Sequence, residues 1–524
     1  MHRRSFLAGA AGALALPAIA RAQSSPLLKF VPQADIASID PIWTTSYQTR
    51  DHGFLVYDTL FGTDADYKVQ PQMLDGFVTE NDDLQWKLTL RDNLKFHDGE
   101  RVLAKDCVAS IARWAKRDSF GQALAAATNE MFAADDRTIV FRLKTKFPLL
   151  PDALGKTAPL MCPMMPARIA QTDAFTKITE TVGSGPFRFR PGERVPGSLL
   201  VYERNTDYVP RPGAASRTAG GKIAHFDRIE WHIMPDPSTV AAALQRGEID
   251  WWDVPVADLI PTLRKAPGVT AQMVVTTGTI GTMRFNQLQP PFDNPAIRRA
   301  MLGAITQSDY MSAVLGDDPT LWRDKVGYFP PGTPMASDAG MQALTSPRDL
   351  DRVKHDLAAA GYNNEKVVVL APQDIPSVKS LADVTADLMK RLGMNLDIEA
   401  MDWATLVQRR AKQDPPDQGG WSVFHTFWSG LDQFNPAGHV FLRGNGKNAQ
   451  PGWPTSPKLE ELRDEWLSAP DLAAQKRICE QMQLQAFQDV PYIPLGQTLI
   501  PAMHRSDLAG ILDGLPLFWN VRRS

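Results

Sequence analysis

Residues 84–99 read LQWKLTLRDNLKFHDG, and this stretch passes from a strand pattern into a turn pattern. Every second residue from Leu84 to Leu90 is apolar, and a period of two predicts a strand with one buried face. The triplet His97-Asp98-Gly99 then predicts a turn. The same alternation recurs over residues 139–144. We therefore predict two half-buried strands in this region of the chain.

Helical patterns lie between and after these strands. Asn294-Pro295 combines an N-cap residue with proline at the first helical position. Apolar residues follow it at helical spacing: Ile297, Met301, Ala304 and Ile305. Ser456-Pro457 predicts the start of another helix, and a last helix around residues 478–482 ends before Pro491. The mixture of strands and helices predicts an α/β fold.

Composition limits the classes of protein that the chain can represent. Its 524 residues are 44% hydrophobic and 22% charged, which is typical of a globular protein with two to four domains. A net charge of −3 lacks the basic excess of a nucleic-acid binder, so no nucleic-acid partner is expected. Cys107, Cys162 and Cys479 lie far apart without a CxxC pair, which excludes a disulfide scaffold and allows one disulfide at most.

The first 22 residues, MHRRSFLAGAAGALALPAIARA, have the pattern of an export signal. Arg3 and Arg4 precede a short apolar stretch, and Ala20-Arg21-Ala22 matches an A-x-A cleavage site. The adjacent arginines predict the twin-arginine route, which exports folded proteins. The apolar stretch is shorter than the ~20 residues that span a membrane. We therefore expect a signal peptide at residues 1–22 and a soluble protein in the periplasm.

Motifs for catalysis, cofactors and metals are weak. Gly155-Lys156-Thr157 lacks the first glycine of a phosphate loop, and Gly183-Ser184-Gly185 is better explained as a tight turn than as a nucleophile elbow. The nine histidines include no HExxH, and His425 and His439 form the one pair that merits a metal test. We predict no cofactor, no metal site and no enzymatic activity.

Several short motifs occur in a fixed order along the chain. They are Tyr57-Asp58-Thr59-Leu60-Phe61, Phe96-His97-Asp98-Gly99, Gly183-Ser184-Gly185-Pro186-Phe187, Gly247-Glu248-Ile249-Asp250, Pro290-Pro291-Phe292-Asp293 and Pro491-Tyr492-Ile493-Pro494-Leu495. The ordered set resembles the extracytoplasmic solute-binding proteins of ABC importers, in the peptide/nickel/opine-type family 5. The motifs together cover nearly all of the chain after the signal, so the resemblance rests on the whole ordered set and not on any single motif.

The resemblance implies a two-lobed periplasmic-binding-protein (Venus-flytrap) fold with a subdomain inserted in the first lobe. Closure of the lobes on a small-molecule or peptide-like ligand would present it to an ABC permease in the inner membrane, and the binding protein would act as a monomer. The expected division is residues 1–22 for the signal, 23–58 for the first segment of lobe I, 59–185 for the inserted subdomain, 186–275 for the second segment of lobe I, 276–488 for lobe II and 489–524 for the C-terminal segment of lobe I.

The resemblance also indicates where an ammonium group would bind. Peptide-binding relatives carry a W-x-x-D loop whose aspartate pairs with the peptide's α-ammonium, and here Trp428 is followed by Leu431 at the matching position and by Asp432 one residue later. The dipeptide binders also use an arginine for the peptide carboxylate. The matching region contains Gln373 and Asp374 and no arginine, which disfavours a dipeptide held at both ends.

Further candidates come from residues near the cleft positions of the family. Thr45, Ser46 and Tyr47 would present polar groups to the ligand, and Trp403 and Trp428 would offer aromatic faces for a cation or a flat group. Core packing is the alternative for Trp403 and for one residue of the pair Trp251-Trp252. Arg284 would anchor an anionic group or, alternatively, form a surface salt bridge.

Three alternatives to a carrier of peptide-like or other small organic solutes remain open at this point. The same fold carries metal complexes and opines in this family. An exported hydrolase would differ by turning over a peptide or an ester. A sensor component would bind a ligand and present it to a receptor instead of a permease.

Overall fold

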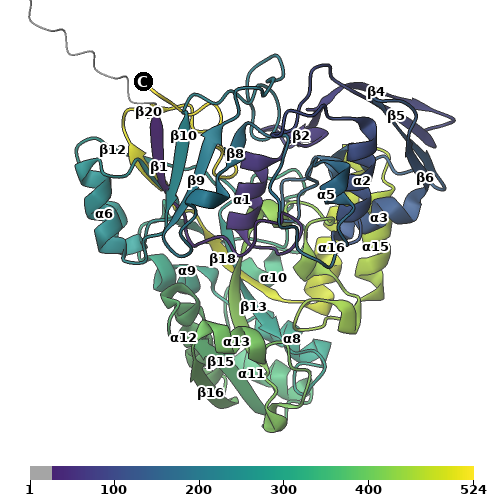
Figure 1. Cartoon of the computed structure of the whole chain (residues 1–524). Coiled ribbons are helices and arrows are strands. Elements are labelled where there is room, and N and C mark those ends of the chain that lie inside the picture. The colour runs from purple at the N-terminus through teal and green to yellow at the C-terminus, as the bar shows by residue number, and fades with distance from the viewer. Residues whose placement is uncertain (1–25) are drawn as a thin grey trace, which may run out of the picture.

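The structure, a computed structural model, describes residues 26–524. The predicted signal peptide lies outside the described residues. No helix within the described range is long and apolar enough to cross a membrane. Three larger sheets organise the chain: one at the upper left of Figure 1, one at the upper right, and one below them.

The first sheet has seven strands. In spatial order they are β12 (Val269–Gln272), β19 (Ala502–Arg505), β11 (Trp251–Trp252), β1 (Leu27–Val31), β10 (Arg228–His232), β9 (Leu199–Arg204) and β8 (Phe187–Phe189). The centre of the sheet is parallel and joins β1 to β10 and β11, whereas the outer strands β9, β8, β19 and β12 pair in antiparallel fashion. Because β11 and β1 are parallel neighbours, their carboxyl ends meet at one edge of the sheet.

The second sheet has four antiparallel strands and contains the opening sequence pattern. Its order is β4 (Leu74–Glu80), β5 (Gln85–Leu90), β7 (Thr138–Leu143) and β6 (Thr128–Ala133). Trp86 of β5 pairs with Phe141 of β7, and both side chains are buried. The two predicted strands are confirmed. The helices α2 (Ala104–Trp114) and α3 (Ser119–Ala127) contact this sheet.

The third sheet has six strands and occupies the lower region of Figure 1. Its order is β14 (Trp322–Arg323), β18 (Ile493–Thr498), β13 (Thr279–Phe285), β17 (Val423–Ser429), β15 (Lys366–Pro372) and β16 (Asn395–Met401). The helices α9 (Gln307–Leu315) and α12 (Pro376–Arg391) pack against it. Strands and helices thus share each large unit, which confirms the predicted α/β class.

The predicted helix starts are also confirmed. Asn294 caps α8 (Pro295–Leu302) by accepting a hydrogen bond from the backbone of Ala296. Ser456 caps α15 (Pro457–Leu467), and the last predicted helix is α16 (Leu472–Asp489). The helix α8 is shorter than its apolar pattern, because Ala304 and Ile305 lie beyond its end although both are buried.

The chain passes between the seven-stranded and six-stranded sheets over residues 273–278, and again over residues 499–501. These two crossing segments lie side by side, because a Cβ atom on Gly278 would stand 1.9 Å from the carbonyl oxygen of Thr498. The hydroxyls of Thr279 and Thr498 are 2.6 Å apart. The predicted boundaries between lobes and subdomain stay predictions.

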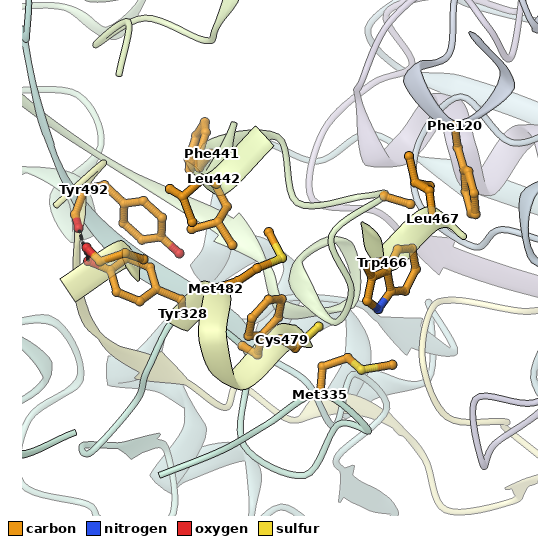
Figure 2. Close-up of a cluster of buried hydrophobic side chains, with 14 of the residues drawn as sticks. Phe120, Tyr328, Met335, Phe441, Leu442, Trp466, Leu467, Cys479, Met482 and Tyr492 are labelled. Atoms are coloured by element: carbon orange, nitrogen blue, oxygen red, sulfur yellow. Dashed lines mark hydrogen bonds between the residues drawn. The ribbon is translucent and has the colours of Figure 1, made fainter. Parts of the chain in front are cut away.

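A continuous hydrophobic core joins the four-stranded and six-stranded sheets. Figure 2 shows a region of it, with Phe120 of α3 beside Leu467 of α15, and with Met482 of α16 between Trp466 and Tyr328. A separate core lies under the seven-stranded sheet. The helices α15 and α16 therefore share a core with the four-stranded sheet and its helices and support them.

The glycines of the segment 183–187 have a different role from the one predicted. Neither Gly183 nor Gly185 adopts a positive φ. A Cβ on Gly183 would stand 2.0 Å from the carbonyl oxygen of Val56, and one on Gly185 would stand 2.7 Å from that of Leu55. The segment bends here, but the glycines are required by the close approach of two backbones rather than by turn geometry.

Candidate functional site

The helix α1 (Tyr47–Val56) is polar in sequence, yet every residue from Gln48 to Val56 is buried. It lies near the centre of Figure 1, between the seven-stranded sheet and the top of the six-stranded one. Burying polar groups is costly unless they find partners. A polar helix in this position therefore places charged side chains where the seven-stranded and six-stranded sheets approach each other.

Arg50 and Asp51 are the charged pair of this helix. The Arg50 Nε donates a hydrogen bond of 2.9 Å to the Asp51 carboxylate, and the guanidinium stacks 5.1 Å from the centre of the Tyr47 ring. The Nη1 of Arg50 is buried and has no hydrogen-bond partner. Burial raises the pKa of Asp51 to about 6, although Arg50 acts against this shift.

The segment after β17 approaches this helix. The backbone amide of Ser429 donates a hydrogen bond of 2.9 Å to the Tyr47 hydroxyl. A Cβ on Gly430 would stand 2.1 Å from the carbonyl oxygen of Thr277, so the segment is also held against the crossing chain. The short helix α14 (Gly430–Gln433) then brings Asp432 into the same region.

Asp432 is 2% exposed, and neither oxygen of its carboxylate has a hydrogen-bond partner. Burial raises its pKa to about 6, while the charges of Arg50 and Lys156 and the Tyr47 hydroxyl act in the opposite direction. Lys156 is itself paired with Asp118. A buried carboxylate without a direct partner is costly, and it requires an explanation such as a water, an ion or a ligand that completes it.

A third carboxyl group belongs to the cluster. Asp253 follows β11 at the carboxyl end of the parallel strands, the edge where ligands of such sheets bind. Burial and the nearby Asp51 raise its pKa to about 8, and Arg50 opposes the shift. Three carboxyl groups thus lie around one guanidinium, and the two whose pKa is about 6, Asp51 and Asp432, are ionised at neutral pH. Two negative charges against one positive charge favour a cationic group.

A small cavity lies beside this cluster, between the insert around α3 and the chain near α14. It is lined by Thr63, Phe120, Thr157, Leu431 and Phe434, among others. Its volume is about 20 Å³, enough for a single water. The Oγ1 of Thr157 is buried without a partner, and the Ser119 hydroxyl donates to the carbonyl oxygen of Ala437 across the same boundary. The insert around α3 and the chain near α14 are therefore in contact beside the cluster.

Some of the predicted site residues meet here. Tyr47 and Asp432 share the cluster, and Trp428 lies just before Ser429. The Trp428 ring packs 4.8 Å from that of Phe441, and its Nε1 has no hydrogen-bond partner. Ser46 is half-buried at the N-cap of α1, with its hydroxyl bonded to Gln48, and Thr45 is exposed.

Gln373, Asp374 and Trp403 form a different group at the ends of β15 and β16. The Asp374 carboxylate accepts a hydrogen bond of 2.8 Å from the Trp403 amide, at the start of α13 (Trp403–Arg409). Gln373 and Asp374 are exposed, and Trp403 is half-buried with Arg410 beside its ring. Within residues 26–524, no hydrogen bond or ion pair joins this group to Tyr47 or Asp432.

Arg284 lies on β13 and is fully buried, so the surface salt bridge considered for it is wrong. It donates hydrogen bonds to the carbonyl oxygens of Phe441, Gln450 and Pro451, and its guanidinium stacks 4.4 Å from the Phe441 ring. Burial lowers its pKa to about 9. These contacts give Arg284 a structural role in holding the 441–451 loop.

The pair His425 and His439 also has protein partners. The Nε2 of His425 is 2.7 Å from the Thr385 hydroxyl, and the Nε2 of His439 contacts the Tyr492 hydroxyl and the Tyr328 carbonyl. Among the residues that the structure describes, no group of three or more possible metal ligands is found. Burial lowers the pKa of both histidines to about 3, which keeps the rings neutral.

Sequence reasoning missed Arg50, Asp51 and Asp253. The polar run Thr49-Arg50-Asp51-His52 followed by apolar residues was one available signal, because a helix can bury a polar run only where tertiary partners exist. Asp253 directly follows two tryptophans, the pattern of a carboxylate at the end of a buried strand.

Two α/β sheets joined by paired crossing segments, with a buried polar cluster between them, define a two-lobed ligand-binding protein. Residues 68–447, more than half of the chain, match the family described as bacterial extracellular solute-binding proteins, family 5 Middle. The chain is 34% identical to the probable peptide ABC transporter periplasmic-binding protein y4tO of Sinorhizobium fredii, over 100% of this chain and 99% of that protein. It is 23% identical to the oligopeptide-binding protein AppA of Bacillus subtilis, over 86% of this chain and 82% of that protein.

Solved structures share the fold. The binding protein AgaA of A. tumefaciens R10, in complex with agropinic acid, superposes with a TM-score of 0.79 at 20% identity and covers 95% of this chain and 99% of its own. A dipeptide-binding protein from Pseudoalteromonas sp. SM9913, in complex with Met-Leu, gives a TM-score of 0.75 at 19% identity, with 95% and 100% covered.

The chain belongs to family 5 of the bacterial extracellular solute-binding proteins. It is the periplasmic solute-binding component of an ABC importer, and its family consists of non-catalytic transporter binding proteins. This membership decides against one of the alternatives above, because an exported hydrolase would not belong to such a family.

Proposed function

We propose that this protein captures a peptide-like or other small organic solute that carries an ammonium group, and delivers it to an ABC permease in the inner membrane. Asp432 binds the ammonium group in the cleft between the lobes. The observation that carries the proposal is the buried Asp432 carboxylate, both of whose oxygens lack a partner. An ammonium group would supply up to three donors and a compensating charge.

Neighbouring residues support this role. Tyr47 reaches across to the backbone of Ser429, and Trp428 offers a half-buried indole whose Nε1 has no partner. The names of several relatives point to solutes of the same kind: a peptide transporter, an oligopeptide-binding protein, and glutathione-binding proteins at 23% identity. A metal complex has less support, because the carboxyl groups of the cluster already face the positively charged guanidinium of Arg50.

The test is native mass spectrometry of the protein purified from periplasm, before and after mild denaturation. Wild-type protein is expected to release a small molecule with an amine. The variant Asp432→Asn is expected to be purified empty. A matched control, Asp464→Asn on the exposed face of α15, should carry the same molecule as wild type. An equal amount bound to Asp432→Asn, or a released metal chelate without an amine, would contradict the proposal.

We also propose that export follows the twin-arginine route and that the mature protein, with the lobe boundaries given above, acts as a monomer. The adjacent Arg3 and Arg4 support the route. Replacing both by lysine should leave the unprocessed precursor in the cytoplasm, whereas replacing Arg21 alone should not. Fractionation followed by immunoblotting measures the result, and normal export of the double variant would refute the route.

A further inference from the structure

We propose that the solute carries its ammonium group and a carboxylate on the same carbon, as a free α-amino-acid head, and that Asp432 and Arg50 bind the two groups side by side. This inference rests on the proposed function, because it adds a second contact to the ammonium site at Asp432. It commits to a ligand chemistry that an ordinary peptide lacks, since the carboxylate on the ammonium-bearing carbon of a peptide is consumed in the first peptide bond.

The donor side of the site is the end of the Arg50 guanidinium. Arg50 is 5% exposed and uses its Nε for Asp51, while Nη1 is buried without a partner. Tyr47 stacks on the flat face of the guanidinium and limits how it can turn. An orphaned buried guanidinium N–H is costly, and a carboxylate is the acceptor whose geometry fits such a fork best.

The acceptor side is Asp432, whose carboxylate oxygens accept no hydrogen bond of regular geometry, although the Tyr47 hydroxyl is near enough to lower the pKa of the carboxyl. Arg50 and Asp432 do not form a salt bridge with each other, yet the guanidinium lowers the pKa of the Asp432 carboxyl and the carboxylate raises the pKa of Arg50. Tyr47 links the two residues, because its ring lies 5.1 Å from the Arg50 guanidinium and its hydroxyl accepts a hydrogen bond from the Ser429 amide, three residues before Asp432. One unpartnered donor and one unpartnered acceptor, both more than nine-tenths buried, thus lie on residues that Tyr47 connects.

Spacing favours an α-amino-acid head over the two ends of a peptide. The ammonium nitrogen and carboxylate carbon of one residue are about 2.5 Å apart, and each further residue adds about 3.5 Å. Groups on one carbon suit a donor and an acceptor in a single cluster. The ends of a peptide suit partners on opposite sides of a long cleft, and the region of Gln373 and Asp374 contains no arginine for that purpose.

The protonation state of Asp253 decides whether the cluster would repel a ligand carboxylate from Arg50. Three ionised carboxylates would repel a ligand carboxylate from Arg50. Burial and the neighbouring Asp51 raise the pKa of the half-buried Asp253 carboxyl to about 8, so most of it is protonated at neutral pH. A neutral carboxylic acid donates a hydrogen bond, so Asp253 is suited to assist a ligand carboxylate instead of repelling it.

The test compares two isomers, γ-glutamylglycine and α-glutamylglycine, by calorimetric titration of the wild-type protein at neutral pH. They have the same atoms and the same charge, but only the γ isomer keeps an ammonium and a carboxylate on one carbon. We expect the γ isomer to bind at least tenfold more tightly. Equal affinities, a preference for the α isomer, or no binding of the γ isomer at millimolar concentration would overturn the inference.

Two variants separate this inference from the proposed function. Arg50→Gln should weaken the γ isomer to the affinity of the α isomer, whereas Asp432→Asn should weaken both isomers. If Arg50→Gln retains the γ preference, the head-group inference fails and the ammonium site stands. If Asp432→Asn leaves both affinities unchanged, the proposed function itself fails. The wild-type comparison needs no substitution, so misfolding of the buried Arg50 variant cannot hide the answer.

Discussion

The single carboxyl group of Asp432 affects both the stability of the ligand-free protein and its proposed ligand binding. In the folded protein burial raises its pKa from 3.8 to about 6. The folded state therefore holds the proton more tightly than the unfolded chain, and this group costs stability progressively as the pH rises from about 4 to about 6. Above that range the full penalty is present in the ligand-free protein.

The variant Asp432→Asn should therefore stabilise the ligand-free protein at neutral pH. A shift of about two pKa units corresponds to roughly 3 kcal/mol, and the buried amide keeps some of that cost, so we expect the free energy of unfolding to rise by about 1–2 kcal/mol. Denaturant unfolding at pH 7 measures it. A lower free energy of unfolding would mean that Asp432 has a structural partner.

Binding of an amine ligand should weaken in acid for the same reason. Below a pH of about 6 Asp432 is protonated, and affinity is expected to fall about tenfold per further pH unit. The groups that face this carboxyl are Tyr47, Arg50 and Asp51 of α1, and Lys156. Asp51 titrates in the same range, so the fall can be steeper than for one group.

The measurement is the ligand dissociation constant from pH 5 to pH 8. The variant Asp432→Asn serves as the control, because its weaker binding should lose most of this dependence. An affinity that is constant between pH 5 and pH 8 in the wild-type protein would contradict a carboxylate–ammonium contact.

At the scale of elements, the segment 183–187 packs against the carboxyl end of α1 and holds this helix in place. Gly183 and Gly185 let this segment approach the backbone at Leu55 and Val56, and the amide of Gly185 donates to the carbonyl oxygen of Val56. The glycines of a short motif thus position the helix that carries Tyr47, Arg50 and Asp51. Their role in the site is indirect.

The variant Gly183→Ala should lower the free energy of unfolding by about 1–3 kcal/mol, because the added Cβ would stand 2.0 Å from a backbone oxygen and force the two segments apart. Gly192→Ala is the matched control, since nothing lies within 4 Å of its Cβ position and its φ is ordinary. Thermal and denaturant unfolding of the two variants measure the difference. Equal stabilities would show that the segment can shift freely.

At the scale of the whole molecule, the two lobes meet through polar contacts around α1. The hydrogen bond from the Ser429 amide to the Tyr47 hydroxyl is one of them, and it joins α1 to the end of β17. Closure around a ligand is a population shift, so each contact made only in the closed state adds to the apparent affinity.

Tyr47→Phe should weaken ligand binding by about fivefold, because it removes one hydrogen bond between the lobes worth about 1 kcal/mol and keeps the ring that stacks on Arg50. The loss should appear mainly as faster ligand dissociation in stopped-flow measurements. Tyr362→Phe, which loses a hydroxyl contact to the Glu365 carbonyl far from the cluster, is the control. Unchanged dissociation in Tyr47→Phe would show that the contact does not hold the lobes together.

Local patterns in the sequence predicted the strands at 84–90 and 139–144, the helix caps at Asn294 and Ser456, and, through the ordered motifs, the family and its fold. Such features depend on periodicity and on neighbours a few residues apart, which the sequence displays directly. The choice of Asp432 as a candidate also followed from a motif. Arg50, Asp51 and Asp253 did not, because residues 50 and 432 are hundreds of positions apart and nothing local marks them as partners. Only the tertiary structure brings one guanidinium and three carboxyl groups into one cluster, because burial and the charges of distant neighbours decide which polar side chain is left for a ligand.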